Sequence, residues 1–351
     1  MTSSETSNKI ANFGLIAAAF VVAIHVHWPW ADSSCAKSIC SSVFQTAVPF
    51  FFTVSGYFLA ARFEEAGWWW RAVRKRIRTL LVPYFACLLI TLALIASIDV
   101  SCNLLAGRYP FENLRGFCGG FRYFFGLHPF GGPEVGALWY IRCLFIFVLL
   151  SPIIKWLDDQ LGRFFLLALA LCSLCVFELL HFGVLSNLGG HWGYVFCYGF
   201  SPWGLLFFVL GIHLRRRRSE RILVSRLFVP SLIFSLLILA VYMVVPKESV
   251  CSWLIPCIPF VSRFAFLIVI WRIVPSRPWP RALTSCSFAI YMLHWVLFYV
   301  FWAFGEQPAG VMGWVYAAGL WIYSFAGSII VARLLSRYLP RFANVLFGGR
   351  V

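Results

Sequence analysis

Charged residues, and acidic ones above all, are scarce in this chain. Only 12% of the 351 residues are charged, and 13 acidic residues stand against 29 lysines and arginines, whereas 61% of the residues are hydrophobic. A soluble globular core of this size does not need so much apolar sequence, so the composition excludes an ordinary soluble domain. The sequence predicts a membrane protein.

Other features that the sequence lacks narrow its organisation. We find no internal repeat, no low-complexity tract and no linker, and no cleavable signal peptide precedes the first apolar run. We therefore expect one membrane domain over residues 1–351. No CxxC pair is accompanied by a second pair or by histidines, so neither a metal site nor a cofactor is expected.

Three pairs of cysteines lie in or beside connections that we expect to face outward. They are Cys35 with Cys40, Cys102 with Cys118, and Cys251 with Cys257. An oxidising exterior permits disulfides there. Disulfides and free thiols are both consistent with the spacing.

Ten stretches of roughly 17–25 mostly apolar residues have the length that a helix needs to cross a bilayer. They are residues 10–30, 43–63, 79–98, 137–157, 163–182, 197–213, 228–246, 251–274, 281–304 and 313–337. Backbone polar groups inside a bilayer must be satisfied within each segment, so the ten stretches predict an all-α bundle of membrane-spanning helices.

Lysines and arginines collect in every second connection between these stretches. Of the 29, 22 lie on one side, five on the other and two inside the stretches. Basic residues favour the cytoplasmic side, so we expect both termini in the cytoplasm. Orientation and anionic lipid headgroups account for the net charge of +16, and nucleic acid is not expected as a partner.

Ionisable side chains inside membrane spans are costly and therefore point to a partner or a cavity. They are His25, His27, Arg142, Glu178, Arg263 and His294. At about 1.5 Å of rise per residue, His25, Arg142 and His294 lie at similar depths in the outer half of the membrane. His25 and His27 are about 200° apart around a helix, so only one faces the bundle core. The shared depth favours a common site, although buried ion pairs that only hold helices together fit the same pattern.

A second group of charges lies on the predicted inner side, just before Pro83 and Tyr84. It holds five cations within eight residues: Arg71, Arg74, Lys75, Arg76 and Arg78. Guanidinium groups bind phosphates, so the cluster predicts either a phosphate site or an orientation signal beside lipid headgroups. The run Arg215–Arg218 is better explained by orientation alone.

Six short motifs occur in order along the predicted spans. They are VVAIH at 21–25, VPFFFTVSGY at 48–57, KRIR at 75–78 followed by VPY at 82–84, LWYIR at 138–142 followed by SP at 151–152, FFVLG at 207–211, and SFAIYMLH at 287–294. Each alone is a weak apolar pattern. Together, on a ten-span frame, they make the chain resemble the acyltransferase-3 family of integral-membrane O-acyltransferases over nearly its whole length.

The resemblance implies that an acyl group, most often acetyl, passes from cytoplasmic acyl-CoA to a hydroxyl of a cell-surface glycan, a glycolipid or a related acceptor. It implies a multi-pass protein of the bacterial cytoplasmic membrane, with acyl-CoA, the acceptor and membrane lipids as its partners. His25 matches the histidine regarded as essential in that family. The matches to its donor-contacting arginines are Arg74, Arg76 and Arg78.

Acyl transfer to an alcohol needs a base for the hydroxyl and a group that stabilises the oxyanion. His25 is the candidate base, because imidazole titrates near neutral pH. No Ser or Cys is clearly placed as a nucleophile, and Ser55 beside Gly56 fits helix packing or hydrogen bonding, so we expect direct attack by the acceptor. The candidate contacts to the acceptor or the oxyanion are Tyr140, Arg142, Tyr291 and His294.

The chain departs from the family pattern at one position. Relatives usually carry Arg or Lys eleven residues before the essential histidine, about 16 Å along the same helix face, and this chain has Gly14 there. Lys9 is a further turn away and is expected outside the membrane. Either another arginine at the inner face contacts the donor, or the activity is altered or lost.

Two other classes of function fit the sequence. Ten spans with internal charges and a basic inner face also suit a transporter or exporter of a lipid-linked or small polar substrate, which would have broken helices in matched halves. We find Pro49, Pro83, Pro152 and Pro202 but no correspondence between the halves. A catalytically inactive relative that serves as a scaffold is consistent with Gly14.

Overall fold

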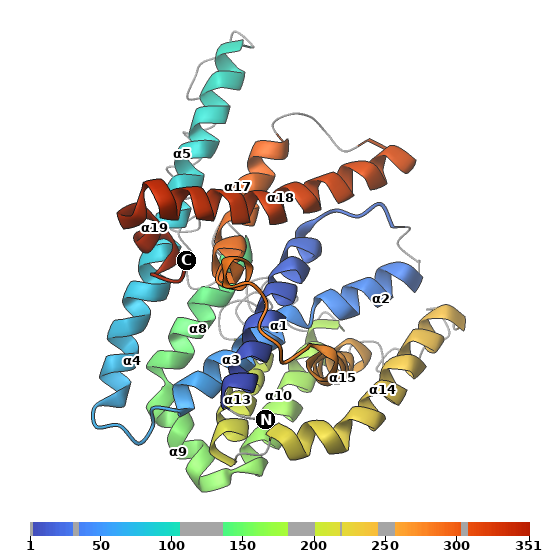
Figure 1. Cartoon of the computed structure of the whole chain (residues 1–351). Helices are drawn as coiled ribbons and strands as arrows, with labels where there is room; N and C mark the ends of the chain where they lie inside the picture. Colours follow the sequence, from blue (N-terminus) through green and yellow to red (C-terminus); the bar gives the residue numbers. More distant parts are fainter. Residues whose placement is uncertain are drawn as a thin grey trace.

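The computed structural model describes residues 3–30, 35–105, 136–181, 201–217, 220–244, 257–302 and 308–351, and within them it is helical without a strand (Figure 1). The helices are α1 (Ser3–His25), α2 (Cys35–Phe44), α3 (Ala47–Ala60), α4 (Trp68–Arg76), α5 (Val82–Leu105), α8 (Trp139–Leu149), α9 (Ser151–Leu161), α10 (Arg163–His181), α13 (Pro202–Arg217), α14 (Glu220–Val244), α15 (Cys257–Ile273), α16 (Arg281–Thr284), α17 (Ser287–Trp302), α18 (Val311–Tyr338) and α19 (Pro340–Phe347). A π-helical segment, η1 (Ile77–Leu81), joins α4 to α5, and a short 3₁₀ segment, η2 (Gly136–Leu138), precedes α8. The all-α prediction is confirmed.

Four of the described helical segments are long and apolar enough to cross a membrane. They are Ser4–His25, Cys40–Ala60, Trp68–Ile98 and Val311–Tyr338. A bent pair, Gly136–Leu149 with Ser151–Leu161, raises the number to five if it counts as one span. Shorter apolar helices occur at Arg163–Val176, Ser225–Ile238 and Ser287–Trp302. Ten spans stay a prediction, since several predicted stretches run into residues outside those that the structure describes.

The predicted span 137–157 is bent by 66° rather than straight. The break falls between α8 and α9, and Pro152 occupies the first turn of α9. A proline there lacks the N–H that would continue the hydrogen-bond ladder of α8. The Ser151 hydroxyl donates to the Val148 carbonyl (2.6 Å), which satisfies one of the acceptors at the break.

Helices α3 and α13 approach each other at two glycines. A Cβ atom on Gly56 would overlap the Phe208 carbonyl oxygen, and one on Gly211 would overlap the Thr53 carbonyl oxygen. Small residues of this kind let helix backbones approach closely inside membranes. The motifs around Gly56 and Gly211 are therefore the two halves of one interhelical contact.

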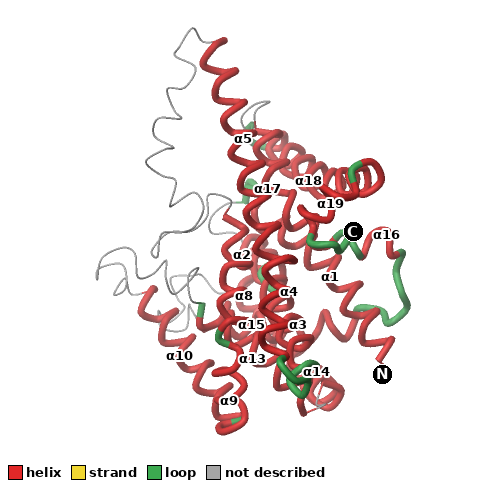
Figure 2. The backbone as a smooth tube through the Cα atoms, turned by 90° about the vertical axis from the view of Figure 1, so that its left-hand side faces the viewer, coloured by secondary structure: helices red, strands yellow, loops and turns green. Residues whose placement is uncertain are grey.

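The centre of the bundle is formed by α1, α3, α8 and α13, with α17 and α18 packed on one side and α14 and α15 on another (Figures 1 and 2). Its core is aromatic, and fully buried rings such as those of Phe52, Phe147 and Phe208 contact one another across helices. This core surrounds the tyrosines and histidines described below.

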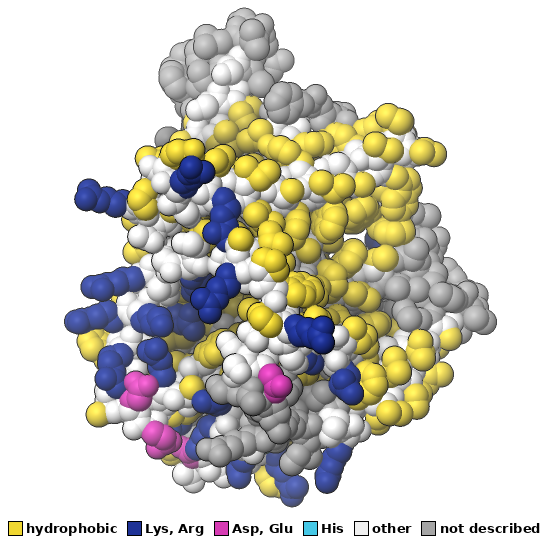
Figure 3. All heavy atoms as spheres, viewed as in Figure 1, with side chains coloured by type: hydrophobic (Ala, Val, Ile, Leu, Met, Phe, Trp, Pro, Cys, Tyr) yellow, Lys and Arg dark blue, Asp and Glu magenta, His cyan; other side chains and the backbone are white. Residues whose placement is uncertain are grey.

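Large apolar side chains are exposed on the outer helices α10, α14 and α18. Leu167, Ile233 and Ile322 are examples, and each has more than half of its surface open. Figure 3 shows hydrophobic side chains over α17, α18 and α14, whereas Lys and Arg gather on the left, over α4 and α19. An apolar periphery of this extent fits lipid rather than water around the bundle.

Arg216, one of the arginines that the sequence analysis assigned to orientation, contributes ion pairs to the structure. Arg216 donates to Asp158 (2.6 Å) and to Asp159, and Lys155 donates to Asp159 (2.7 Å). These pairs join the end of α13 to α9. Their carboxylates compensate Arg216, in contrast to the arginines described next.

Candidate functional site

A cavity of about 400 Å³, here called the polar cavity, lies between α1, α3, α8 and α17. Its polar lining residues are Ser55, Arg76, Tyr140, Thr284, Ser285, Ser287, Tyr291 and Arg350. Gly14 of α1 forms part of the wall and contributes no side chain. Separate elements contribute its polar groups: α4 contributes a cation, α8 and α17 contribute tyrosines, and the connection before α17 contributes hydroxyls.

Two guanidinium groups face this cavity. Arg76 is the last residue of α4, and Arg350 follows α19, with its guanidinium carbon 3.9 Å from the centre of the Phe288 ring. Among the described residues, no carboxylate pairs with either group. Burial and the nearby charge of Arg76 lower the pKa of Arg350 to about 10. The cavity is therefore a cationic pocket that suits an anion.

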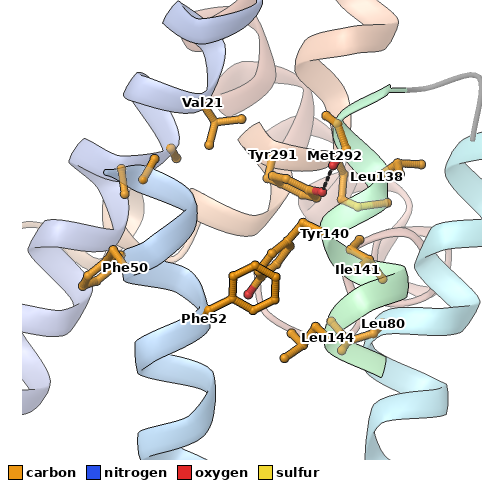
Figure 4. Packing of buried hydrophobic residues seen from close by; sticks show 14 of the residues in the cluster. Val21, Phe50, Phe52, Leu80, Leu138, Tyr140, Ile141, Leu144, Tyr291 and Met292 are labelled. Carbon is orange, nitrogen blue, oxygen red and sulfur yellow. Dashed lines mark hydrogen bonds between the residues drawn. The ribbon is translucent and has the colours of Figure 1, made fainter. Parts of the chain in front are cut away.

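Hydroxyl groups line the deeper part of the polar cavity. The hydroxyls of Ser55 and Tyr140 lie 3.3 Å apart, and the rings of Tyr140 and Tyr291 have centroids 5.7 Å apart. Tyr291 donates its hydroxyl hydrogen to the Ala137 carbonyl, the dashed line in Figure 4. The two tyrosines lie one above the other between α3 and α8, with Phe52 beside them. Ser55 thus has the hydrogen-bonding role expected from the sequence.

A pair of histidines lies on the same side of the bundle. His25, the last residue of α1, stacks on His294 of α17 with ring centroids 5.4 Å apart, and its ring also meets the edge of Trp295 at 4.7 Å. Two of the three residues that the sequence places at a similar depth, His25 and His294, are therefore in contact. Their roles stay predictions.

The hydrogen bond of His294 fixes its tautomer. Nδ1 lies 3.1 Å from the Ile290 carbonyl oxygen, and since a carbonyl only accepts, Nδ1 carries the hydrogen. In the neutral ring, Nε2 then holds the lone pair. Both His294 Nε2 and Trp295 Nε1 are buried without a hydrogen-bond partner among the described residues. Unsatisfied buried groups are costly, so each of these two atoms is a candidate partner for a polar ligand.

The polar cavity and the histidine pair are neighbours on α17. Tyr291 lines the cavity, and His294 follows three residues later on the same helix face, with ring centroids 6.2 Å apart. The cavity lining ends at Tyr291 and includes neither His25 nor His294. One helical turn of α17 therefore separates the cationic pocket from the imidazoles.

The remaining predicted site residues occupy different surroundings. Arg74 and Arg78 are exposed outside the cavity lining, and Arg74 lies over the Trp70 ring at 5.9 Å. Arg142 is half-buried on α8, also outside that lining. His27 is exposed just beyond the end of α1, so of the two first-span histidines only His25 faces the core.

Arg263, an ionisable residue of a predicted span, lies outside the lining of the polar cavity. It donates to the Gln45 side chain (2.5 Å) and lies over the Trp203 ring, so it ties α15 to the turn after α2 and to α13. The side chain of Glu178 lies outside the described residues. Arg263 is thus an instance of the packing role that the sequence left open.

Lys9 is buried within the protein. It lies inside α1, only 7% exposed, and donates to the Trp271 carbonyl (2.7 Å). An amine bound to a helix-end carbonyl is stabilised without reaching water. Lys9 therefore anchors α1 to α15 and does not face the polar cavity.

The sequence analysis missed Arg350 and Trp295. Arg350 stands outside every predicted span, and its only sequence signal is the preceding pair Gly348–Gly349, which permits a sharp turn. Trp295 is adjacent to His294, and an indole N–H inside a predicted span is a polar group that needs a partner.

Of the cysteines in the three pairs expected to face outward, Cys40 has a free thiol. The side chains of the other five lie outside the described residues.

A second cavity, here called the apolar cavity, has a volume of about 580 Å³ and lies between α1, α3, α13, α14 and α15. Its lining is almost entirely hydrocarbon and includes Leu267. Ile10, Phe50 and Val54 line both cavities and therefore form a shared wall.

Comparison with known proteins places the chain in a family. An acyltransferase domain, the acyltransferase-3 family model, matches residues 15–333, which is nearly the whole chain. Comparisons with curated proteins and with solved structures gave no significant match. The match covers His25, Arg76, Tyr140, Tyr291 and His294, whereas Gly14, α19 and Arg350 lie outside it. With its apolar helices and this domain, the chain belongs to the acyltransferase-3 family of membrane acyltransferases.

Proposed function

We propose that the protein transfers an acyl group, with acetyl the first choice, from cytoplasmic acyl-CoA to a hydroxyl of a cell-surface glycan, glycolipid or related acceptor. The observation that carries this proposal is the order of groups in space. A cationic cavity leads to two tyrosines, and one helical turn further lie two stacked imidazoles. The frame that we propose has ten spans, both termini in the cytoplasm, and a bacterial cytoplasmic membrane as its location.

The donor would bind with its phosphates on Arg76 and the other inner arginines. Guanidinium groups form charge-assisted hydrogen bonds with phosphate oxygens, and Arg76 has no competing carboxylate among the described residues. The acyl end of the donor would then extend past Tyr140 towards His25. Arg74 and Arg78, exposed at the same end, would attract the anionic donor from a distance.

His25 would act as the general base. In a direct transfer, the acceptor hydroxyl gives its proton to the His25 ring as its oxygen attacks the thioester carbonyl, and the carbon–sulfur bond then breaks. The leaving CoA sulfur takes that proton from the His25 ring and departs as the thiol. No acyl-enzyme is needed, which agrees with the absence of a serine or cysteine beside the histidine pair in the contacts of the described residues.

Tyr140 is our candidate for stabilising the oxyanion, in preference to Tyr291. The Tyr291 hydroxyl hydrogen is already donated to a carbonyl, whereas the Tyr140 hydroxyl shares only a 3.3 Å contact with another hydroxyl. His294 would orient the acceptor, because its Nε2 lone pair can accept the hydrogen of a sugar hydroxyl. Arg142, deeper on the expected outer side of α8, would contact an acceptor that enters from outside.

The test is acyl transfer by purified protein in lipid nanodiscs. Release of free CoA thiol from acetyl-CoA reports turnover, and mass spectrometry of surface glycans from cells with and without the gene identifies the acceptor. His25→Ala should abolish turnover while the protein remains inserted. His27→Ala is the matched control, since that exposed histidine two residues away should be dispensable. Full activity in His25→Ala would refute the assignment.

The same assay separates the transferase from the two alternatives. An exporter and an inactive scaffold should each release no thiol from acyl-CoA under any condition. Within the described residues there is one sharply bent helix pair, α8 with α9, and an alternating-access exporter should show a counterpart in the other half. We therefore keep the transferase as the proposal.

A further inference from the structure

The segment that follows α19 returns to the polar cavity. Arg350 lies in the cavity lining together with Arg76, although their chain positions are far apart. Its guanidinium stacks on Phe288 at the start of α17, a cation–π contact that fixes the side chain. Three features of the chain build this arrangement.

The first feature is the anchoring of α19. Ala343, Leu346 and Phe347 are at most 4% exposed, and they form one face of this short amphipathic helix. The helix packs against α5, η1 and α18. Its position is therefore set by buried side chains rather than by the charge at its end.

The second feature is a turn made of two glycines. Gly348 and Gly349 have φ values of 61° and 70°, in the left-handed region that other residues rarely adopt. A Cβ on Gly348 would lie 2.7 Å from the Thr79 carbonyl oxygen in η1. Glycine is thus needed both for the backbone conformation and for the close approach, and the turn directs Arg350 inward.

The third feature is the uncompensated charge. Two guanidinium groups share one cavity, and the nearby hydroxyls of Ser285 and Ser287 are also in its lining. Like charges brought together away from bulk water are unfavourable unless an anion lies between them. Gly14 leaves room on the α1 wall of the same cavity, since a Cβ there would make only an ordinary contact 3.5 Å from the Ser287 hydroxyl.

We propose that Arg350 and Arg76 together form a phosphate-binding site in the polar cavity, and that Arg350 supplies there the cation that the first helix lacks at Gly14. If this site binds the donor, the inference rests on the proposed function, and the occupant of the site would be the diphosphate of acyl-CoA. The headgroup phosphate of an anionic lipid has the same chemistry. Arg350 and Gly14 both lie outside the matched residues 15–333.

The experiment measures binding to the full-length protein in phosphatidylcholine nanodiscs. The probes are CoA, inorganic diphosphate and pantetheine, which lacks the phosphates. Arg350→Ala should weaken binding of CoA and diphosphate about 10- to 100-fold, the loss expected for hydrogen bonds to a charged group, and leave pantetheine unchanged. Arg350→Lys should recover part of the loss, because lysine keeps the charge without the planar fork.

Arg341→Ala is the matched control, since Arg341 is exposed on α19, the helix that precedes Arg350, and its binding should equal that of the wild type. Lipid mass spectrometry of protein purified from phosphatidylglycerol membranes distinguishes the sources. Loss of bound phosphatidylglycerol in Arg350→Ala, with CoA binding unchanged, would assign the phosphate to lipid. Binding of both CoA and lipid unaltered in Arg350→Ala would overturn the site.

This outcome is separate from that of the proposed function. Diphosphate binding that depends on Arg350 in a protein that never turns over acyl-CoA would retain the phosphate site and reject the transferase. Turnover of acyl-CoA that is unchanged in Arg350→Ala, with no loss of diphosphate binding, would retain the transferase and reject the phosphate site. Thermal unfolding of each variant confirms that the compared proteins are folded.

Discussion

The two cavities share a wall yet differ in chemistry. Ile10, Phe50 and Val54 face the polar cavity on one side and the apolar cavity on the other. The polar cavity contains two arginines and two tyrosines, whereas the larger apolar cavity is lined mainly by hydrocarbon. One pair of helices, α1 with α3, thus separates the surroundings of an anion from those of a hydrocarbon chain.

The difference shows where function is concentrated in this bundle. A hydrocarbon cavity is favourable beside lipid and needs no particular ligand, because lipid tails can fill it. Two half-buried like charges in one cavity repel each other, and a bound anion relieves that repulsion. The location of the charges, rather than the size of a cavity, therefore identifies the candidate site.

The largest expected effect comes from disrupting the contact between α13 and α3, the helix that carries Phe50 and Val54 of the shared wall. Gly211→Ala places a methyl group into the Thr53 carbonyl of α3, and such overpacking should cost about 3 kcal/mol. Loss of folded protein, or a clearly lower unfolding temperature in detergent, is expected. Gly319→Ala on α18, where the space is open, is the control and should be neutral or slightly stabilising. Equal behaviour of the two variants would contradict the close α3–α13 contact.

The next effect concerns the imidazoles beyond the polar cavity. His294→Ala should lower kcat for acyl transfer about 100-fold, because the acceptor hydroxyl loses the hydrogen bond that orients it towards His25, with little change in CoA binding. His294→Asn, whose side chain can replace one hydrogen bond, should lose less. Steady-state kinetics in nanodiscs measures both. Unchanged kcat in His294→Ala would leave the stacked ring with a packing role only.

A smaller effect is expected for Tyr140. Tyr140→Phe keeps the ring that contacts Phe52 and Tyr291 but removes the hydrogen bond to the developing oxyanion, so kcat should fall about 10- to 100-fold. Tyr291→Phe removes a hydroxyl that donates to a backbone carbonyl, so it should lower the unfolding temperature and change kcat little. A larger kcat loss in Tyr291→Phe than in Tyr140→Phe would reverse the proposed assignment of the oxyanion contact.

The smallest effect is expected for a substitution in the lining of the apolar cavity. Leu267→Ala enlarges the apolar cavity without touching the polar one, so the KM for acetyl-CoA should stay within about twofold of the wild type. Kinetics with longer acyl-CoA donors provides a second measurement. A strong change in KM for acetyl-CoA would show that the shared wall transmits changes between the cavities.

Much of the fold followed from the sequence. Apolar length predicted an all-helical bundle, and the depth count placed His25, Arg142 and His294 at a similar level, because rise per residue and membrane thickness are fixed quantities. The contact between His25 and His294 agrees with that count. The Ser55–Gly56 motif was correctly assigned to packing and hydrogen bonding. These are local or one-dimensional properties of the chain.

Tertiary properties were beyond the sequence. The bend between α8 and α9, the buried position of Lys9 and the return of Arg350 depend on which helices become neighbours. Among the five clustered cations, only Arg76 lines the cavity, since helix phase relative to α8 and α17 determines which side chain turns inward. Spacing along one helix cannot supply that phase.

The most direct test of the central claim compares kinetic constants in one preparation. If the polar cavity holds the donor and the imidazoles perform the transfer, Arg76→Ala should raise the KM for acetyl-CoA about 10- to 100-fold, and His25→Ala should abolish kcat while CoA binding persists. Loss of CoA binding in His25→Ala, or an unaltered KM in Arg76→Ala, would contradict that division of labour.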